Sequence, residues 1–303
     1  IGIGARRKRR SPEPAAWIGW AFIAPNLVGF AVFTFFPLLF SLAISFAEWD
    51  VISGLDNIRW VGLDNFRSML GAGDFWAAGS RTLVYAGVGV PLTTAAGLLV
   101  AMALNGPIPG RAALRLIFFI PFIANAVAIA ATWILLYDPR YGPINRFLQA
   151  LGIADPPLWL ASSDWALTAL IIMAVWHGAG YAAVIYLAAL QDVPQELHEA
   201  AALDGAGTWE RFKAVTFPFL TPTSFFLIIT GFIGASQSFG MINLMTQGGP
   251  GQATTVLSYY VYLNAFRFYQ FGYASAVAWM MFLVILVLTL LLWRVQRRGI
   301  FYG

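Results

Sequence analysis

Long apolar stretches, separated by short polar segments, dominate this chain. Six of them are long enough to cross a bilayer, which takes roughly 20 mostly apolar residues per helix, and none has Asp, Glu or Lys in its central turns. The windows are 17–46, 80–104, 113–137, 165–190, 219–243 and 273–293. A lone strand would leave backbone groups unpaired in lipid. The pattern therefore predicts an all-α integral membrane protein with six transmembrane helices.

Composition supports this class of protein. Hydrophobic residues make up 59% of the 303 and charged residues only 11%, whereas soluble domains carry about 25% charged residues. The chain has no cysteine, which excludes a disulfide framework and a thiolate metal site, and we expect no metal site. The net charge of +4 does not indicate nucleic-acid binding, because the basic residues cluster beside the apolar windows, where they set topology.

The N-terminal segment carries the sequence RRKRR at 6–10, directly before the first apolar run. That run is longer than the apolar part of a secretory signal, and no small-residue cleavage site follows it. We therefore expect a retained first span and three regions. These are a basic cytoplasmic N-terminus (1–16), a six-helix transmembrane domain (17–293) and a cytoplasmic C-terminus (294–303).

Lys and Arg are distributed unequally between the two sets of loops. With the N-terminus inside, 12 of the 18 lie on the inner side and 6 on the outer side. The positive-inside rule then places both termini in the cytoplasm. The outer loops are rich in Trp, Pro, Gly and Asn, which set turns and anchor the chain at headgroup level.

A polar segment at 191–217, which we call the elbow loop, lies between the fourth and fifth windows on the inner side. Seven charged residues lie between Asp192 and Lys213, and burying them would cost on the order of 20 kcal/mol at about 3 kcal/mol each. The loop therefore stays in water or against a soluble partner.

The sequence of the elbow loop predicts two short helices joined by a hinge. Pro194 and Glu196 suit a helix start, and Gly205 and Gly207 suit its end. Thr208 is expected to cap a second short helix, which Pro218 ends before Pro222 opens the next span. The spacing alone leaves two interpretations open: a rigid elbow that another protein grips, and a plain amphipathic connector.

A motif in the elbow loop carries a family resemblance. Glu199-Ala200-Ala201 is followed after three residues by Gly205, and after nine more by Val215-Thr216-Phe217-Pro218. This resembles the EAA loop of binding-protein-dependent ABC importer permeases, whose pattern is EAA-x3-G-x9-I-x-L-P. Val replaces Ile and Phe replaces Leu here.

The resemblance covers nearly the whole chain. Segments 23–38, 61–66, 142–148 and 246–287 are similar to the sugar-importer branch, in particular to the first permease of heterodimeric maltose-type and glycerol-3-phosphate-type systems. It implies the type I importer permease fold in a bacterial or archaeal plasma membrane. It also implies a second homologous permease, two cytoplasmic ATP-binding subunits that hold ATP and Mg, and an extracytoplasmic solute-binding protein, which we expect near 248–250.

In that family the EAA loop forms the coupling helix, which docks on the ATPase. The resemblance thus implies coupling roles for Glu199 as the charged contact, for Ala200 and Ala201 as the packed face and for Gly205 as the hinge. Asp204 and Pro218 complete the expected coupling set. The chain itself would be non-catalytic and carry no cofactor.

Polar residues inside the spans are candidates for the solute path. We expect substrate contacts from Asn125, Trp176, Tyr181, Gln237 and Asn243, because aromatic faces and amides suit a neutral polyol. Gln237 and Asn243 are nearly two turns apart and could share one helix face. Other roles remain open: Trp176 packing in the core, His177 as a buried neutral histidine bonded to backbone, and Ser236 and Ser238 bonding between helices.

No Arg or Lys lies in mid-span, which favours a neutral or zwitterionic solute. A partner permease could supply a charge, so glycerol-3-phosphate or a glycerophosphodiester remains an alternative. An intramembrane enzyme is disfavoured because HExxH, GxSxG and GxxxxGK[ST] are missing from the sequence. A channel or secondary carrier is disfavoured because the spans lack mid-span acids and filter-like rings.

Overall fold

The computed structural model describes residues 16–50, 52 and 54–296. Within them, five helices are long and apolar enough to cross a membrane, and a bent pair of helices makes a sixth candidate span. The six predicted windows thus each correspond to a candidate span. The predicted N-terminal segment 1–16 and C-terminal tail 294–303 lie almost entirely outside the described residues.

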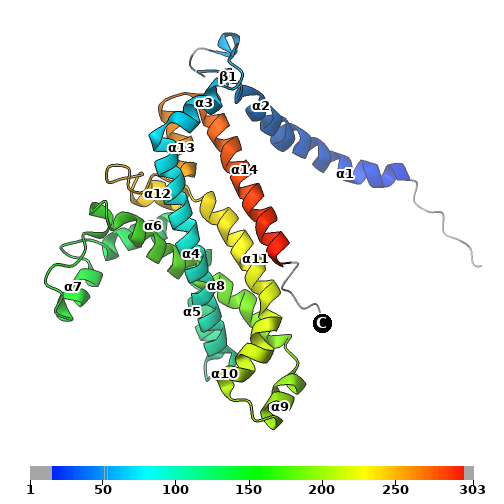
Figure 1. Cartoon of the computed structure of the whole chain (residues 1–303), viewed down its shortest axis with the longest axis vertical. Coiled ribbons are helices and arrows are strands. Elements are labelled where there is room, and N and C mark those ends of the chain that lie inside the picture. Colours follow the sequence, from blue (N-terminus) through cyan, green and yellow to red (C-terminus); the bar gives the residue numbers. More distant parts are fainter. Residues whose placement is uncertain (1–15, 51, 53, 297–303) are drawn as a thin grey trace, which may run out of the picture.

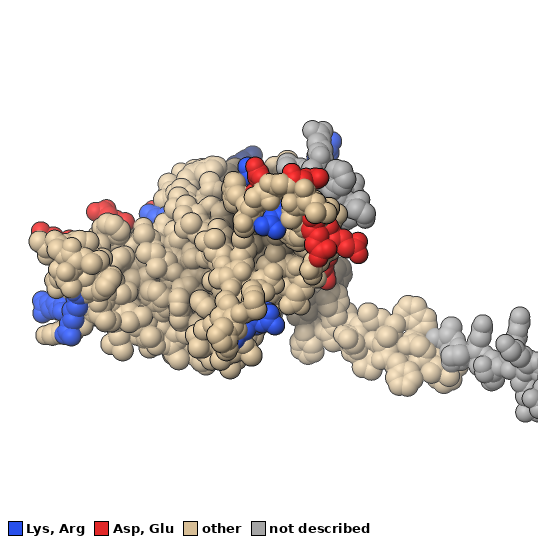
Figure 2. All heavy atoms as spheres, turned by 90° about the horizontal axis from the view of Figure 1, so that it is seen from below, with Lys and Arg blue, Asp and Glu red and all other residues tan. Residues whose placement is uncertain are grey.

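The first span leaves the body of the molecule as a separate arm (Figure 1). It comprises α1 (Ala16–Phe30), the π-helical turn η1 (Ala31–Phe35) and α2 (Phe36–Ile44). Only 6% of its most apolar window is buried within this chain. Seen from below in Figure 2, the arm is almost free of charged side chains. Its surroundings must therefore be lipid or another apolar surface.

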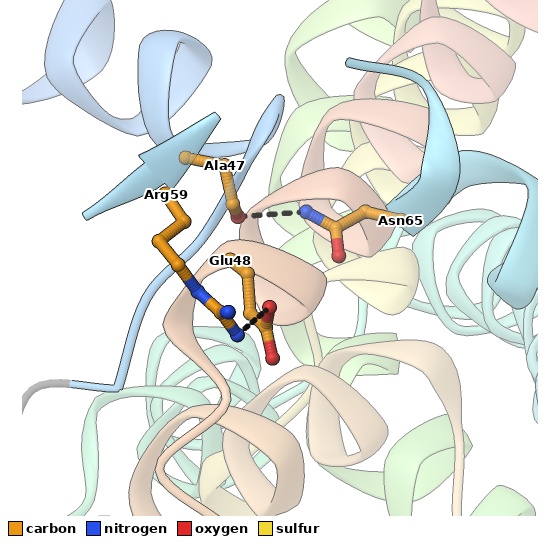
Figure 3. Close-up of polar contacts among 4 residues, drawn as sticks. All are labelled: Ala47, Glu48, Arg59 and Asn65. Carbon is orange, nitrogen blue, oxygen red and sulfur yellow. Dashed lines mark hydrogen bonds and ion pairs between the residues drawn. The ribbon is translucent and has the colours of Figure 1, made fainter. Parts of the chain in front are cut away.

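A small hairpin and a short helix connect the first two spans. They are β1 (Ala47–Glu48), the 3₁₀ turn η3 (Leu55–Asn57), β2 (Arg59–Trp60) and α3 (Asp64–Gly71). The strands pair antiparallel, with Glu48 opposite Arg59, and the Arg59 guanidinium donates to the Glu48 carboxylate at 2.6 Å. The Asn65 amide donates to the Ser45 carbonyl at 2.9 Å and to the Ala47 carbonyl at 2.8 Å, the bond drawn in Figure 3. These contacts fix the hairpin and α3 against the end of the first span.

The second and fourth spans form the centre of the bundle. They are α4 (Gly73–Asn105) and α8 (Ala166–Gln191). Small residues permit their close approach, since a Cβ at Gly97 on α4 would collide with Ala182 on α8. A Cβ at Gly180 on α8 would likewise collide with the Phe118 carbonyl in the third window. Such close contacts of small residues are the usual way in which helices associate in membranes.

The third window is not one straight helix, and here the prediction of a continuous span over 113–137 was wrong. It divides into α5 (Arg111–Ile123) and α6 (Ala126–Leu136), which meet at 98°. Ala124 and Asn125 have extended backbones, and the Asn125 side chain accepts a hydrogen bond from the Val127 N–H at 2.8 Å. Asn125 therefore caps a new helix, and the break follows from local capping.

The segment between α6 and α8 contains α7 (Pro143–Ala150) and the 3₁₀ turn η4 (Trp159–Ala161). Asn145 is 98% buried, as its exposure is only 2%. Its amide donates to the carbonyls of Pro139 and Pro157, and its oxygen accepts from the Trp159 indole at 2.6 Å. One amide thus ties three parts of this loop together.

The fifth window also differs from the prediction. The elbow loop contains α9 (Gln195–Leu203), α10 (Thr208–Arg211) and the π-helical turn η5 (Phe212–Thr216), and η5 leads into α11 (Phe217–Ser236). The span runs over Thr208–Ser236 and does not continue to 243. Pro218 and Pro222 lie within this helical run. Pro218 follows the wider π turn directly, where a missing N–H is accommodated.

The chain then leaves the bundle and returns for the last span. It passes through α12 (Gly240–Met245), a glycine-rich loop, α13 (Leu257–Tyr262) and the π turn η6 (Leu263–Arg267) before α14 (Phe271–Gln296). The hydroxyls of Thr246 and Thr254 lie 2.7 Å apart, and Thr255 donates to the Gly248 carbonyl. These bonds fold the loop against the end of α12.

Candidate functional site

The end of α9 is closed by a glycine in the left-handed region. Gly205 has φ = 82°, and its N–H donates to the Ala202 carbonyl at 3.1 Å, while the Ala206 N–H donates to the Ala201 carbonyl at 2.9 Å. This pair of bonds is the Schellman ending of a helix, which favours glycine because a Cβ is strained there. The structure thus has the helix end that the sequence predicts at Gly205, and the role of Gly205 as a hinge stays a prediction.

The second half of the elbow loop corrects two predictions. Gly207, with an extended backbone, is the N-cap, and Thr208 already belongs to the helix; the Gly207 N–H donates to the Glu210 carboxylate at 2.7 Å. A glutamate three residues after the cap selects this boundary. Pro218 does not end the helix, which continues into the span. The elbow loop is therefore joined to α11 without a break.

The elbow loop projects from one end of the bundle (Figure 1), and acidic side chains gather around that end (Figure 2). Glu199 and Ala200 are exposed, and Ala201 is half-buried. Glu199 accepts a hydrogen bond only from Gln195, at 2.9 Å, among the residues described. Leu203 is 90% exposed, which the motif does not predict. Glu199, Ala200 and Leu203 are thus all accessible at this end of the bundle.

A central cavity of about 530 Å³ lies among the second to fifth spans. No Asp, Glu, Lys or Arg is among its lining residues, and its polar groups are hydroxyls and one imidazole. The lining residues are Tyr85, Gly89, Val90, Thr93, Thr94, Phe122, Ala174, His177, Gly178, Tyr181, Ala182, Leu227, Thr230, Gly231, Gly234, Ala235 and Ser238. This is the size of cleft that holds a small molecule.

Aromatic rings form one wall of this cavity. The Phe122 ring stacks on Tyr181 with centroids 4.7 Å apart and lies 5.8 Å from His177. Across the cavity, the hydroxyls of Tyr85 and Ser238 are 3.4 Å apart. Rings beside hydroxyls can contact the C–H faces and the hydroxyls of a polyol at the same time.

Of the five predicted substrate residues, only Tyr181 lines the cavity. Trp176 packs edge to face against Trp133 with centroids 5.4 Å apart, and it is not among the lining residues. His177, which the sequence favours as a buried residue bonded to backbone, does line the cavity. His177 and Tyr181 are four residues apart and therefore share a helix face, which is a signal that the sequence already contains.

The other three predicted residues lie away from the cavity lining. Asn125 is exposed and caps α6. Gln237 follows the last residue of α11, and Asn243 lies on the separate helix α12. The prediction that Gln237 and Asn243 share one helix face was wrong, because the helix ends at Ser236. Substrate contact by these three side chains stays a prediction.

Sequence reasoning missed the contribution of the second span. Thr93 and Thr94 on α4 and Thr230 on α11 line the cavity, and each hydroxyl donates to a carbonyl one turn earlier. Their oxygens can still accept a hydrogen bond. Adjacent threonines in an otherwise apolar window are the pattern that could have indicated them. Within the described residues, no three His, Asp or Glu side chains form a group able to hold a metal ion.

Comparison with known proteins places this architecture in a family. Residues 70–299 match the family described as "binding-protein-dependent transport system inner membrane component". The chain is 35% identical over 305 residues to the probable ABC transporter permease protein YesP of Bacillus subtilis, covering 99% of this chain and 97% of that protein. It is 36% identical to the trehalose/maltose transport system permease protein MalF of Thermococcus litoralis, covering 93% and 94%.

A solved structure has the same fold. A chain of the bacterial alginate ABC transporter, in complex with a periplasmic protein that carries an alginate pentasaccharide, matches with a TM-score of 0.80 at 24% identity, covering 93% of this chain and 94% of that one. The permease fold predicted from the sequence is confirmed. The chain belongs to the family of binding-protein-dependent transport system inner membrane components.

Proposed function

We propose that this chain is one permease subunit of an ATP-driven importer that moves a sugar or related polyol into the cell. One observation carries the proposal: α11 lines the central cavity through Thr230, Gly231 and Gly234 and extends, without a break in the helix, into the elbow loop. A displacement of the elbow loop therefore acts directly on a wall of the cavity.

The proposed assembly contains this chain, a second homologous permease, two cytoplasmic ATP-binding subunits and an extracytoplasmic solute-binding protein. ATP and Mg would be held by the ATP-binding subunits. Both termini and the elbow loop would face the cytoplasm, and the glycine-rich loop at 248–250 would face the binding protein. Glu199, Ala200 and Leu203 would seat in the ATP-binding subunit, Gly205 would hold the angle of α9, and α11 would transmit the movement.

The cavity chemistry supports a neutral solute. Its walls offer hydroxyls, an imidazole and aromatic rings, and no charged side chain. A phosphate dianion would be desolvated there without a cation to pair with it. The relative named for trehalose and maltose transport supports the same class. A glycerol phosphate importer remains the second candidate, because the partner permease could contribute a cation to a shared cavity.

Purification of the whole assembly with its binding protein tests the proposal. ATP hydrolysis would be measured in proteoliposomes with the binding protein loaded in turn with disaccharides, amino sugars and glycerophosphodiesters. We expect hydrolysis to rise only with the loaded binding protein, and most with a neutral sugar. Solute flux that proceeds without ATP would instead indicate a channel or a secondary carrier.

A further inference from the structure

A second cavity lies beneath α9, between the elbow loop and the ends of two spans. Its volume is about 310 Å³. The lining residues come from the last turns of α4 and α8, from α9 and from the run α10–η5: Met102, Asn105, Leu190, His198, Thr208, Arg211, Phe212 and Thr216. The cavity is separate from the central one, with which it shares no lining residue.

Arg211 is the cation of this cavity, and it is incompletely paired. Its Nε is buried and has no hydrogen-bond partner within the described part of the chain. Neither of the two ion pairs found there includes it. Glu199 and Glu210 nearby in sequence bond to Gln195 and to the Gly207 N–H instead. No carboxylate within the described residues therefore balances the Arg211 charge at the wall of this cavity, so the site favours an anionic ligand.

The remaining walls define the kind of anion. Thr208, Thr216 and the Asn105 amide offer hydrogen-bond donors, and His198 adds an imidazole. Met102, Leu190 and Phe212 form an apolar wall beside them. Guanidinium and hydroxyl donors suit phosphate oxygens, whereas the apolar wall suits the hydrocarbon that adjoins a phosphate diester. The cavity also lies where α4 and α8 end, at the level expected for headgroups.

We propose that this cavity binds a phosphate group through Arg211, with the headgroup of an anionic phospholipid as its source. His198 lies on α9, whereas the other lining residues lie on the span ends and on α10–η5. A bound phosphate would therefore bridge the elbow loop and the bundle and hold the angle between them. This effect on the angle of the elbow loop rests on the proposed function, whereas the binding of the phosphate group does not.

The test measures binding by the purified full-length chain in neutral detergent. Retention of added phosphatidylglycerol, with phosphatidylcholine as reference, would be counted by native mass spectrometry, and inorganic phosphate would be titrated calorimetrically. Arg211→Gln should lower phosphatidylglycerol retention about tenfold, the loss expected for one charge-assisted hydrogen-bond donor. Lys213→Gln is the matched control, because Lys213 lies over the Trp209 ring, 5.5 Å from its centroid, and does not line the cavity.

Arg211→Lys keeps the charge and should retain part of the binding, which separates a lost site from a misfolded variant. Binding of inorganic phosphate that disappears in Arg211→Gln, without a lipid preference, would support the phosphate site and assign it to a soluble source. Equal retention by wild type and Arg211→Gln, or an equal loss in Lys213→Gln, would overturn the proposal. The Arg211 charge would then serve only to offset the partial negative charge at the C-terminal ends of the neighbouring helices. Because no transport is measured, failure here leaves the proposed function standing.

Discussion

Replacement of Gly205 by proline should abolish the stimulation of ATP hydrolysis by the loaded binding protein, while the chain still inserts into the membrane. Gly205 has φ = 82°, and proline fixes φ near −65°. Proline also lacks the N–H that donates to the Ala202 carbonyl at 3.1 Å. The unfavourable φ and the lost hydrogen bond together cost on the order of 3 kcal/mol or more. They also change the direction in which α9 leaves the bundle. Stimulated hydrolysis in the purified assembly is the measurement.

Two variants serve as controls for Gly205→Pro. Gly207 has φ = −68°, and a Cβ there would meet only the Glu210 carboxylate at 3.6 Å, so Gly207→Ala should leave coupling intact. Gly205→Asn should be tolerated better than proline, because asparagine enters the left-handed region at low cost. Normal stimulation in Gly205→Pro would show that the angle of α9 is irrelevant to coupling.

Replacement of Gly234 by phenylalanine should block solute uptake at least about tenfold, a loss of roughly 1.4 kcal/mol or more, without unfolding the chain. Gly234 lines the central cavity on α11, and a Cβ at this position has no heavy atom within 4 Å. A large ring can therefore enter the open space that the solute would occupy. Uptake of labelled solute into proteoliposomes is the measurement, with the amount of folded chain determined by gel filtration.

Gly87→Phe is the matched control for the cavity variant. Gly87 is an exposed glycine within the α4 span, and a Cβ there also has no atom within 4 Å, but it does not line the cavity. It should transport normally unless the partner permease covers that face. If Gly234→Phe transports as well as wild type, the solute does not pass through this cavity.

The positions of the spans and the elbow loop could be predicted because they depend on local chemistry. Apolar length alone located the windows, and glycine at 205 predicted the helix end that the structure contains. The breaks were harder to predict. Asn125 looks like a polar residue in a span until its side chain is seen to cap α6. Pro218 looks like a helix end until the π turn before it is known.

The central cavity was predicted only in part, because it forms from four spans that are distant in sequence. Tyr181 on α8 lines the cavity, but Trp176 packs on Trp133 and is not among the lining residues. The side chains that close the cavity from α4, including Tyr85 and Thr93, depend on how α4 crosses α8. That crossing is set by close contacts such as Gly97 with Ala182, which a single sequence does not reveal.

Cross-linking of the elbow loop to a neighbour tests the central claim most directly. The chain has no cysteine, so Ala200→Cys on the exposed face of α9 and Ala150→Cys on α7 each introduce a single thiol at an exposed position. Each would be treated with a short bifunctional reagent in the intact assembly. The account predicts a cross-link from position 200, but not from 150, to an ATP-binding subunit, at a yield that changes when nucleotide is added. Absence of that product from position 200 in an assembly that still hydrolyses ATP would contradict the account.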